Sequence, residues 1–67
     1  MKVQINGEMI EIPETIETVT QLIEHLELSS PVIIVEHNEE VLQKDQHQAT
    51  KLSSGDKIEF VQFVGGG

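Results

Sequence analysis

The residues best suited to chemistry are the three glycines that end the chain, Gly65, Gly66 and Gly67. Glycine has no Cβ, so a run of three is thin and its backbone reaches positive φ angles without steric penalty. Such a segment can pass through a channel too narrow for a side chain and present a free carboxylate at its tip. We therefore predict a domain over residues 1–64 and a flexible glycine tail over residues 65–67. A frayed end without a role is the alternative at this point.

The other polar residues do not form a recognisable catalytic set. A metal site would need the histidines to converge with carboxylates, but they are scattered at His25, His37 and His47. The serines lie in turn contexts with no base at a spacing that would activate a nucleophile. The chain has no cysteine, which excludes a disulfide, a thiolate zinc site and a cysteine nucleophile. We expect a protein that is not an enzyme and that binds no metal or cofactor of its own.

The charge of the chain restricts its partners. Its 67 residues carry twelve acidic residues against four lysines, for a formal net charge of -8. Nucleic acids and anionic membranes are poor partners for such a chain, whereas a basic protein surface suits it. No apolar stretch reaches membrane-spanning length, and the N-terminus lacks the layout of a signal peptide. We expect a cytoplasmic protein that is a monomer when free.

The chain opens with a predicted β-hairpin. Alternating segments at residues 2–5 and 8–12 flank Asn6-Gly7, the strongest short hairpin signal because a type I′ turn needs two positive φ angles. A two-residue loop places Val3 opposite Ile10. This register puts four apolar residues on one face, which we expect to be buried: Val3, Ile5, Ile10 and Ile12.

One helix is expected next. It begins near Val19 and runs for about ten residues, and Thr18 with Gln21 forms a predicted capping box. Its apolar stripe follows helical spacing at Val19, Leu22, Ile23 and Leu26. A helix this short needs a surface to pack against, which the hairpin supplies.

Two longer strands and a short one complete the expected fold. The β-branched run at residues 32–35 predicts an interior strand or one covered on both faces, and we expect it to return beside the first strand. Val41-Leu42 is at most a short strand, residues 44–50 form a polar loop with one helical turn at most, and Leu52 plugs the core. The last strand covers residues 57–64. A mixed β-sheet packed on one helix is the α+β arrangement of the ubiquitin-like β-grasp.

The last strand predicts a contact surface beside the tail. If Ile58 and Phe60 point into the core, Val61 and Phe63 lie on the face that the single helix leaves open. Exposed apolar residues on an acidic domain commonly mark a binding surface. A loop that folds over these residues is the alternative.

From the Asn6-Gly7 hairpin to its end, the chain resembles the ThiS family, the bacterial sulfur carriers of thiamin thiazole biosynthesis. The resemblance includes the capped helix, residues 32–38, residues 55–58 and the ending Phe63-Val64-Gly65-Gly66-Gly67. The terminal glycines are the specific part, because the fold alone is shared by many unrelated modules.

The resemblance implies roles for particular residues. Gly67 would be the covalent carrier: a ThiF-like adenylyltransferase uses ATP, with magnesium, to adenylate its carboxylate, and sulfur from a persulfide enzyme then gives a thiocarboxylate. A ThiG-like thiazole synthase consumes that sulfur. Gly65 and Gly66 would thread the partners' active sites, while Val61, Phe63 and Val64 would form the partner interface.

Two alternatives stay open. One is a similar carrier for molybdopterin synthesis, like the somewhat longer small subunit MoaD. The other is a non-covalent β-grasp interaction module whose glycines are a passive end.

Overall fold

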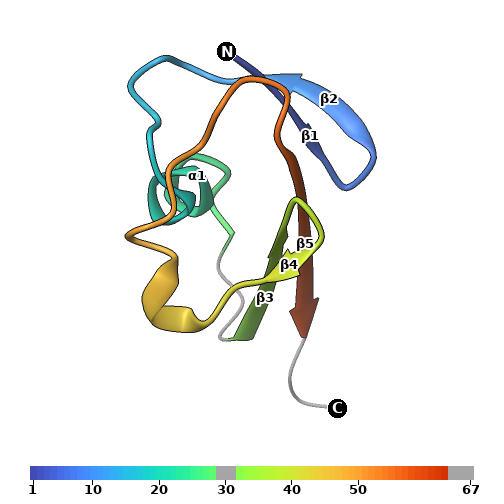
Figure 1. The fold of residues 1–67 in the computed structure, drawn as a ribbon, viewed down its shortest axis with the longest axis vertical. Helices are drawn as coiled ribbons and strands as arrows, with labels where there is room; N and C mark the ends of the chain where they lie inside the picture. The colour runs from blue at the N-terminus through green and yellow to red at the C-terminus, as the bar shows by residue number, and fades with distance from the viewer. Residues whose placement is uncertain (29–31, 64–67) are drawn as a thin grey trace.

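The computed structural model describes residues 1–28 and 32–63 of the chain. Within them the chain forms β1 (Lys2–Ile5), β2 (Glu8–Glu11), α1 (Val19–His25), β3 (Val32–His37), β4 (Glu40–Val41), a short 3-10 helix η1 (Lys44–Gln46) and β5 (Lys57–Phe63) (Figure 1). The strands lie in one sheet in the order β2-β1-β5-β3-β4. β1 and β5 are parallel, and the other neighbours are antiparallel. This mixed sheet with one helix is the predicted β-grasp arrangement.

The hairpin is confirmed in turn and in register. Asn6 has φ of 48° and Gly7 has φ of 86°, as a type I′ turn requires. Val3 pairs with Ile10 and Ile5 with Glu8. Since paired residues share a face, this register directs Val3, Ile5 and Ile10 toward the core, whereas Met9 pairs with Gln4 and is exposed on the opposite face.

The helix begins as predicted but is shorter. Thr18 accepts a hydrogen bond from the backbone N–H of Gln21, whose side chain caps the Thr18 N–H in return. Seven residues are helical rather than about ten. The helix ends early because Glu27 takes φ of 56°, and the N–H of Leu28 bonds back to the Ile23 carbonyl at 3.2 Å. These are the marks of a Schellman C-cap.

The position of β3 differs from the prediction. We expected it beside β1, but β5 occupies that place and β3 lies on the far side of β5. The rule for crossovers fixes their handedness and not the number of strands they pass over. The connection through α1 passes over two strand positions, and β5 fills the gap with Ile58 and Phe60 buried against the helix.

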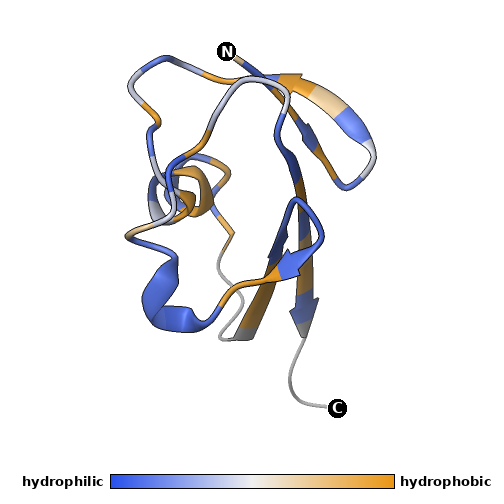
Figure 2. Ribbon diagram, viewed as in Figure 1, coloured by the Kyte–Doolittle hydropathy of each residue, from blue (hydrophilic) through white to orange (hydrophobic). Residues whose placement is uncertain are grey.

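A single apolar cluster lies between the sheet and the helix. Its buried members come from the strands, the helix and two loops: Val3, Ile5, Ile12, Val19, Leu22, Val35, Leu52, Ile58 and Phe60. Leu52 is therefore the core residue that the sequence predicts. Figure 2 shows hydrophobic and hydrophilic bands along β5, as expected for a strand with one covered face, whereas β3 is hydrophobic over its first four residues and hydrophilic at its end. In the described part of the chain, no helix has the length and apolarity needed to span a membrane.

Candidate functional site

The last strand places Val61 where the sequence predicts. Ile58 and Phe60 are buried in the core, whereas Val61 is 48% exposed on the opposite face of the sheet. We call this opposite face the open face. The side chain of Phe63, and the whole of Val64 and the glycines at 65–67, lie outside the described residues. Their roles in docking and in sulfur transfer stay predictions.

The open face carries more apolar surface than the sequence indicates. Ile34 pairs with Val61 across β3 and β5 and is 38% exposed. Val41, also exposed, pairs with Glu36 from the other side of β3. Because paired residues share a face, Ile34, Val41 and Val61 lie on the open face together, and we call them the apolar patch. Ile34 and Val41 were missed, because the continuous run at residues 32–35 gives no alternation and the pairing depends on the topology.

Charged residues continue the open face beyond the patch. Glu36 and Glu59 lie directly opposite each other on β3 and β5. Lys57 precedes Glu59 by two residues and therefore shares its face. The open face therefore mixes charged and apolar residues: Ile34 and Val61 lie toward the end of β5, whereas Val41 lies level with Glu36 and Glu59.

Asn6 holds β5 against the hairpin. Its Oδ1 accepts the backbone N–H of Phe60 at 2.8 Å, and its Nδ2 donates to the Phe60 carbonyl at 3.4 Å. Backbone bonds from Gln4 to Asp56 and from Asn6 to Ile58 precede this contact. The side-chain amide therefore continues the parallel β1–β5 ladder by one more residue after the hairpin has turned away. It fixes the strand from which the chain runs toward the glycines.

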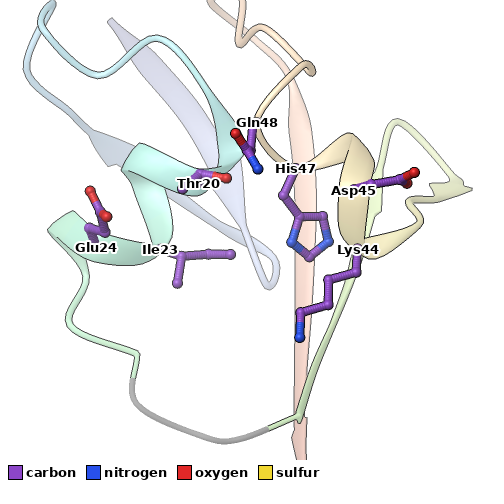
Figure 3. A pocket seen from close by; sticks show the side chains of 7 residues that line it. All are labelled: Thr20, Ile23, Glu24, Lys44, Asp45, His47 and Gln48. Atoms are coloured by element: carbon purple, nitrogen blue, oxygen red, sulfur yellow. The ribbon is translucent and has the colours of Figure 1, made fainter.

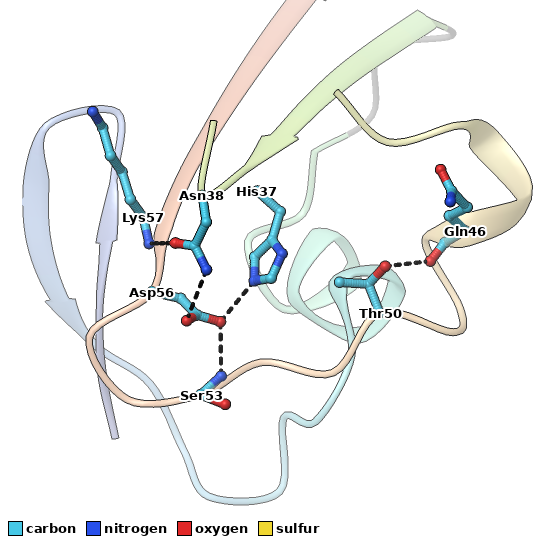
Figure 4. A network of polar contacts seen from close by, with 7 residues as sticks. All are labelled: His37, Asn38, Gln46, Thr50, Ser53, Asp56 and Lys57. Atoms are coloured by element: carbon cyan, nitrogen blue, oxygen red, sulfur yellow. Dashed lines mark hydrogen bonds and ion pairs between the residues drawn. The ribbon is translucent and has the colours of Figure 1, made fainter. Parts of the chain in front are cut away.

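A polar network fixes the start of the same strand (Figure 4). His37 Nε2 lies 2.7 Å from Asp56 Oδ2, which also accepts the Ser53 N–H at 2.9 Å. Asn38 Nδ2 donates to the other Asp56 oxygen at 3.3 Å, and Asn38 Oδ1 accepts the Lys57 N–H at 2.9 Å. Burial opposes the ionised form of Asp56, but hydrogen bonds from His37, Ser53 and Asn38 outweigh it and lower the pKa of this carboxyl. The network joins the end of β3 to the start of β5, and His37 serves it as a structural residue.

A hollow of about 530 Å³ lies on the helix side of the sheet, away from the open face (Figure 3). Its lining comes from α1 and from η1 with the residues that follow it: Thr20, Ile23, Glu24, Lys44, Asp45, His47 and Gln48. Burial, and to a lesser degree the nearby Lys44 charge, lower the pKa of His47. His47 Nε2 is buried and has no hydrogen-bond partner among the described residues. Among the described residues, no serine or threonine is hydrogen-bonded to this nitrogen.

Comparison with known proteins gives consistent matches. The family model described as the ThiS family matches residues 3–67. The sulfur carrier protein ThiS of Bacillus subtilis (strain 168) is 34% identical over 64 residues, which cover 96% of this chain and 97% of that protein. A thiazole synthase of Paramagnetospirillum magneticum (strain ATCC 700264 / AMB-1) is 37% identical over 67 residues. That match covers 100% of this chain but only 20% of the synthase.

Solved structures match the whole fold. A crystal structure of the thiamine biosynthesis protein ThiS from Geobacter metallireducens has a TM-score of 0.84 and 33% sequence identity, with 100% of both chains covered. A solution structure of a thiamine biosynthesis protein from the same organism has a TM-score of 0.82, also at 33% identity, and covers 100% of this chain and 88% of that one. The sheet order and the helix described above are therefore shared with experimentally determined relatives.

Proposed function

The chain belongs to the ThiS family, and on that premise we propose that it is a sulfur carrier that delivers sulfur for formation of the thiamin thiazole. The observation that carries the proposal is the match of the family model over residues 3–67, which includes the glycines. The proposed role is that of a protein cosubstrate, which one enzyme loads with sulfur and another relieves of it. The named relatives belong to the thiamin pathway, which favours it over the molybdopterin pathway.

Gly67 is the residue on which the chemistry takes place in this proposal. A carboxylate is a poor electrophile, so its oxygen first attacks the α-phosphorus of ATP and pyrophosphate leaves. The terminal sulfur of an enzyme persulfide then attacks the carbonyl carbon, and AMP leaves. A thiol cleaves the S–S bond of this acyl disulfide, supplying two electrons, and releases the thiocarboxylate with a new disulfide. ATP and magnesium belong to the ThiF-like adenylyltransferase.

The absence of side chains at Gly65 and Gly66 suits passage into narrow active sites. A residue with a Cβ would widen the segment and restrict its φ angles. Recognition of the carrier then depends on the folded domain, because glycines without side chains offer a partner little to distinguish. We propose that Val61, with Phe63 and Val64, docks on the partners, and the exposure of Val61 on the open face supports this.

The function is tested with the chain, its ThiF-like adenylyltransferase and a persulfide donor from the same organism. We expect ATP–pyrophosphate exchange and, after the donor and a thiol are added, a mass increase of about 16 Da for one oxygen replaced by sulfur. A chain that lacks Gly67 should show neither signal and the same thermal melting as the parent. Normal exchange by the shortened chain would refute the role of Gly67.

A further inference from the structure

Two glutamates on the open face oppose each other without compensation. Glu36 on β3 and Glu59 on β5 are directly paired in the antiparallel register, so both side chains stand on the open face. Glu59 is exposed and Glu36 is half-buried. Like charges directly opposite each other on a sheet destabilise it. The free domain therefore retains a feature that lowers its own stability.

Neither carboxylate has an ionic partner in the described part of the chain. The ion pairs there join the Met1 ammonium to Glu11 and Glu14, and Asp56 lies within hydrogen-bond distance of His37. The lysine that shares the face with Glu59, at position 57, makes no ion pair with it. The negative charge of the pair is thus available to a partner, in a protein whose net charge is already -8.

The pair borders the apolar patch. Ile34 and Val61 form the cross-strand pair two residues along β3 and β5 on the same face. Val41 stands opposite Glu36 on the other side. A partner that covers Ile34, Val41 and Val61 must also exclude water from part of the space around the two carboxylates. Attraction to a cation is much stronger in such a setting than in water.

We propose that Glu36 and Glu59 together receive an arginine side chain of the thiazole synthase when the apolar patch docks on that enzyme. This rests on the proposed function. A guanidinium is planar, has donors on more than one edge and is weakly hydrated, so it can serve two carboxylates beside apolar residues better than an ammonium. The thiazole synthase is the partner because a sequence matching this whole chain forms 20% of a relative with that name. Parts of one chain are held close together by the chain itself, whereas a carrier on a separate chain must bind the synthase through contacts on its surface.

The test measures binding of the full carrier to the thiazole synthase of the same organism by titration calorimetry. The variants are E36Q, E59Q and the double variant, because glutamine keeps the size and removes the charge. The matched control is Glu24→Gln with Glu27→Gln, which removes the same charge from and beside α1. We expect the dissociation constant to rise about tenfold or more for E36Q/E59Q, and by less than about threefold for the control. We also expect the double variant to be no less stable than the parent in urea, because a repulsion has been removed.

Each result decides the matter. A tenfold loss of affinity without loss of stability supports the arginine contact, and a parent-like dissociation constant overturns it. An equal loss of affinity in the control variant would show that only long-range attraction is at work, and it would overturn the arginine contact. Failure of the parent carrier to bind the synthase would overturn it too. If the parent chain still gains sulfur in any of these cases, the proposed function stands and this inference alone fails. If it gains none, the function fails on its own test.

Discussion

Replacing Asn6 separates the two tasks of that residue, which are to form the hairpin turn and to hold β5. Asn6 sits at φ of 48°, and its side-chain amide makes both hydrogen bonds to the Phe60 backbone. Asn6→Ala removes both contributions. Asn6→Gly keeps the turn conformation and removes only the bonds. Asn6→Asp keeps the acceptor of the 2.8 Å bond and loses the donor of the longer one.

The magnitudes follow from these contacts. A residue with a Cβ but without the local hydrogen bonding of asparagine costs about 1–2 kcal/mol in the left-handed region. The part-buried N–H of Phe60, left without a partner, costs about 1–3 kcal/mol. We therefore expect Asn6→Ala to lower the free energy of unfolding by about 2–5 kcal/mol, and Asn6→Gly, which keeps only the second of these costs, to lower it by about 1–3 kcal/mol. Asn6→Asp should fall closest to the parent.

Urea unfolding followed by circular dichroism measures these differences, with an unchanged m-value as the check that only stability has changed. If the alanine and glycine variants are equally stable, the positive φ angle contributes nothing and our account of the turn is wrong. If the glycine variant matches the parent, the bonds to Phe60 contribute nothing. At a temperature where all variants are folded, activation of the chain end should be unaffected, because Asn6 acts on the strand and not on the reacting carboxylate.

Three further outcomes are expected. Phe60→Ala should lower the free energy of unfolding by about 3–5 kcal/mol. Val61→Ser should change that free energy by less than about 1 kcal/mol and should weaken partner binding. A large loss of stability in the Val61 variant would show that the open face is covered. Because the folded-state pKa of Asp56 lies below the ordinary 3.8, its contribution to stability is present above that pH and is lost as the pH falls through and below it. Urea unfolding at pH 5 and pH 3 should therefore show a smaller loss in Asp56→Asn than in the parent, and equal losses would contradict the network. Gly66→Val should block adenylation by the ThiF-like enzyme while leaving thermal melting unchanged. Adenylation at the parent's rate would refute the proposal that this residue passes through a narrow channel.

The local features of this fold could be read from the sequence because short-range physics sets them. The type I′ turn needs two residues with positive φ angles, which Asn6-Gly7 supplies. The capping box at Thr18 needs only a hydroxyl and an amide three residues apart. Alternation in the last strand likewise assigned Phe60 to the core and Val61 to the open face. Each of these predictions depends on neighbours within a few residues.

The features that were missed depend on contacts between distant segments. The central place of β5 follows from which strands fill the sheet, which alternation in one segment does not encode. The apolar patch needs Ile34 beside Val61, and the opposition of Glu36 and Glu59 needs the same register. Likewise, the positive φ angle of Glu27 that ends α1 early falls on a residue type that gives no such signal. The sequence therefore predicted the part of the candidate site that lies on β5 and missed the parts on β3 and β4.

The central place of β5 has a consequence for synthesis of the protein. The hairpin of β1 and β2 and the pair of β3 and β4 are joined in the sheet only through β5, which follows all the other strands in the chain. A growing polypeptide cannot close this sheet until residues through Phe63 have left the ribosome. Incomplete chains lack the strand that covers the core and stay open to proteolysis. A protein that recognises the closed sheet would thus bind only chains in which β5 has been made and has paired with both β1 and β3.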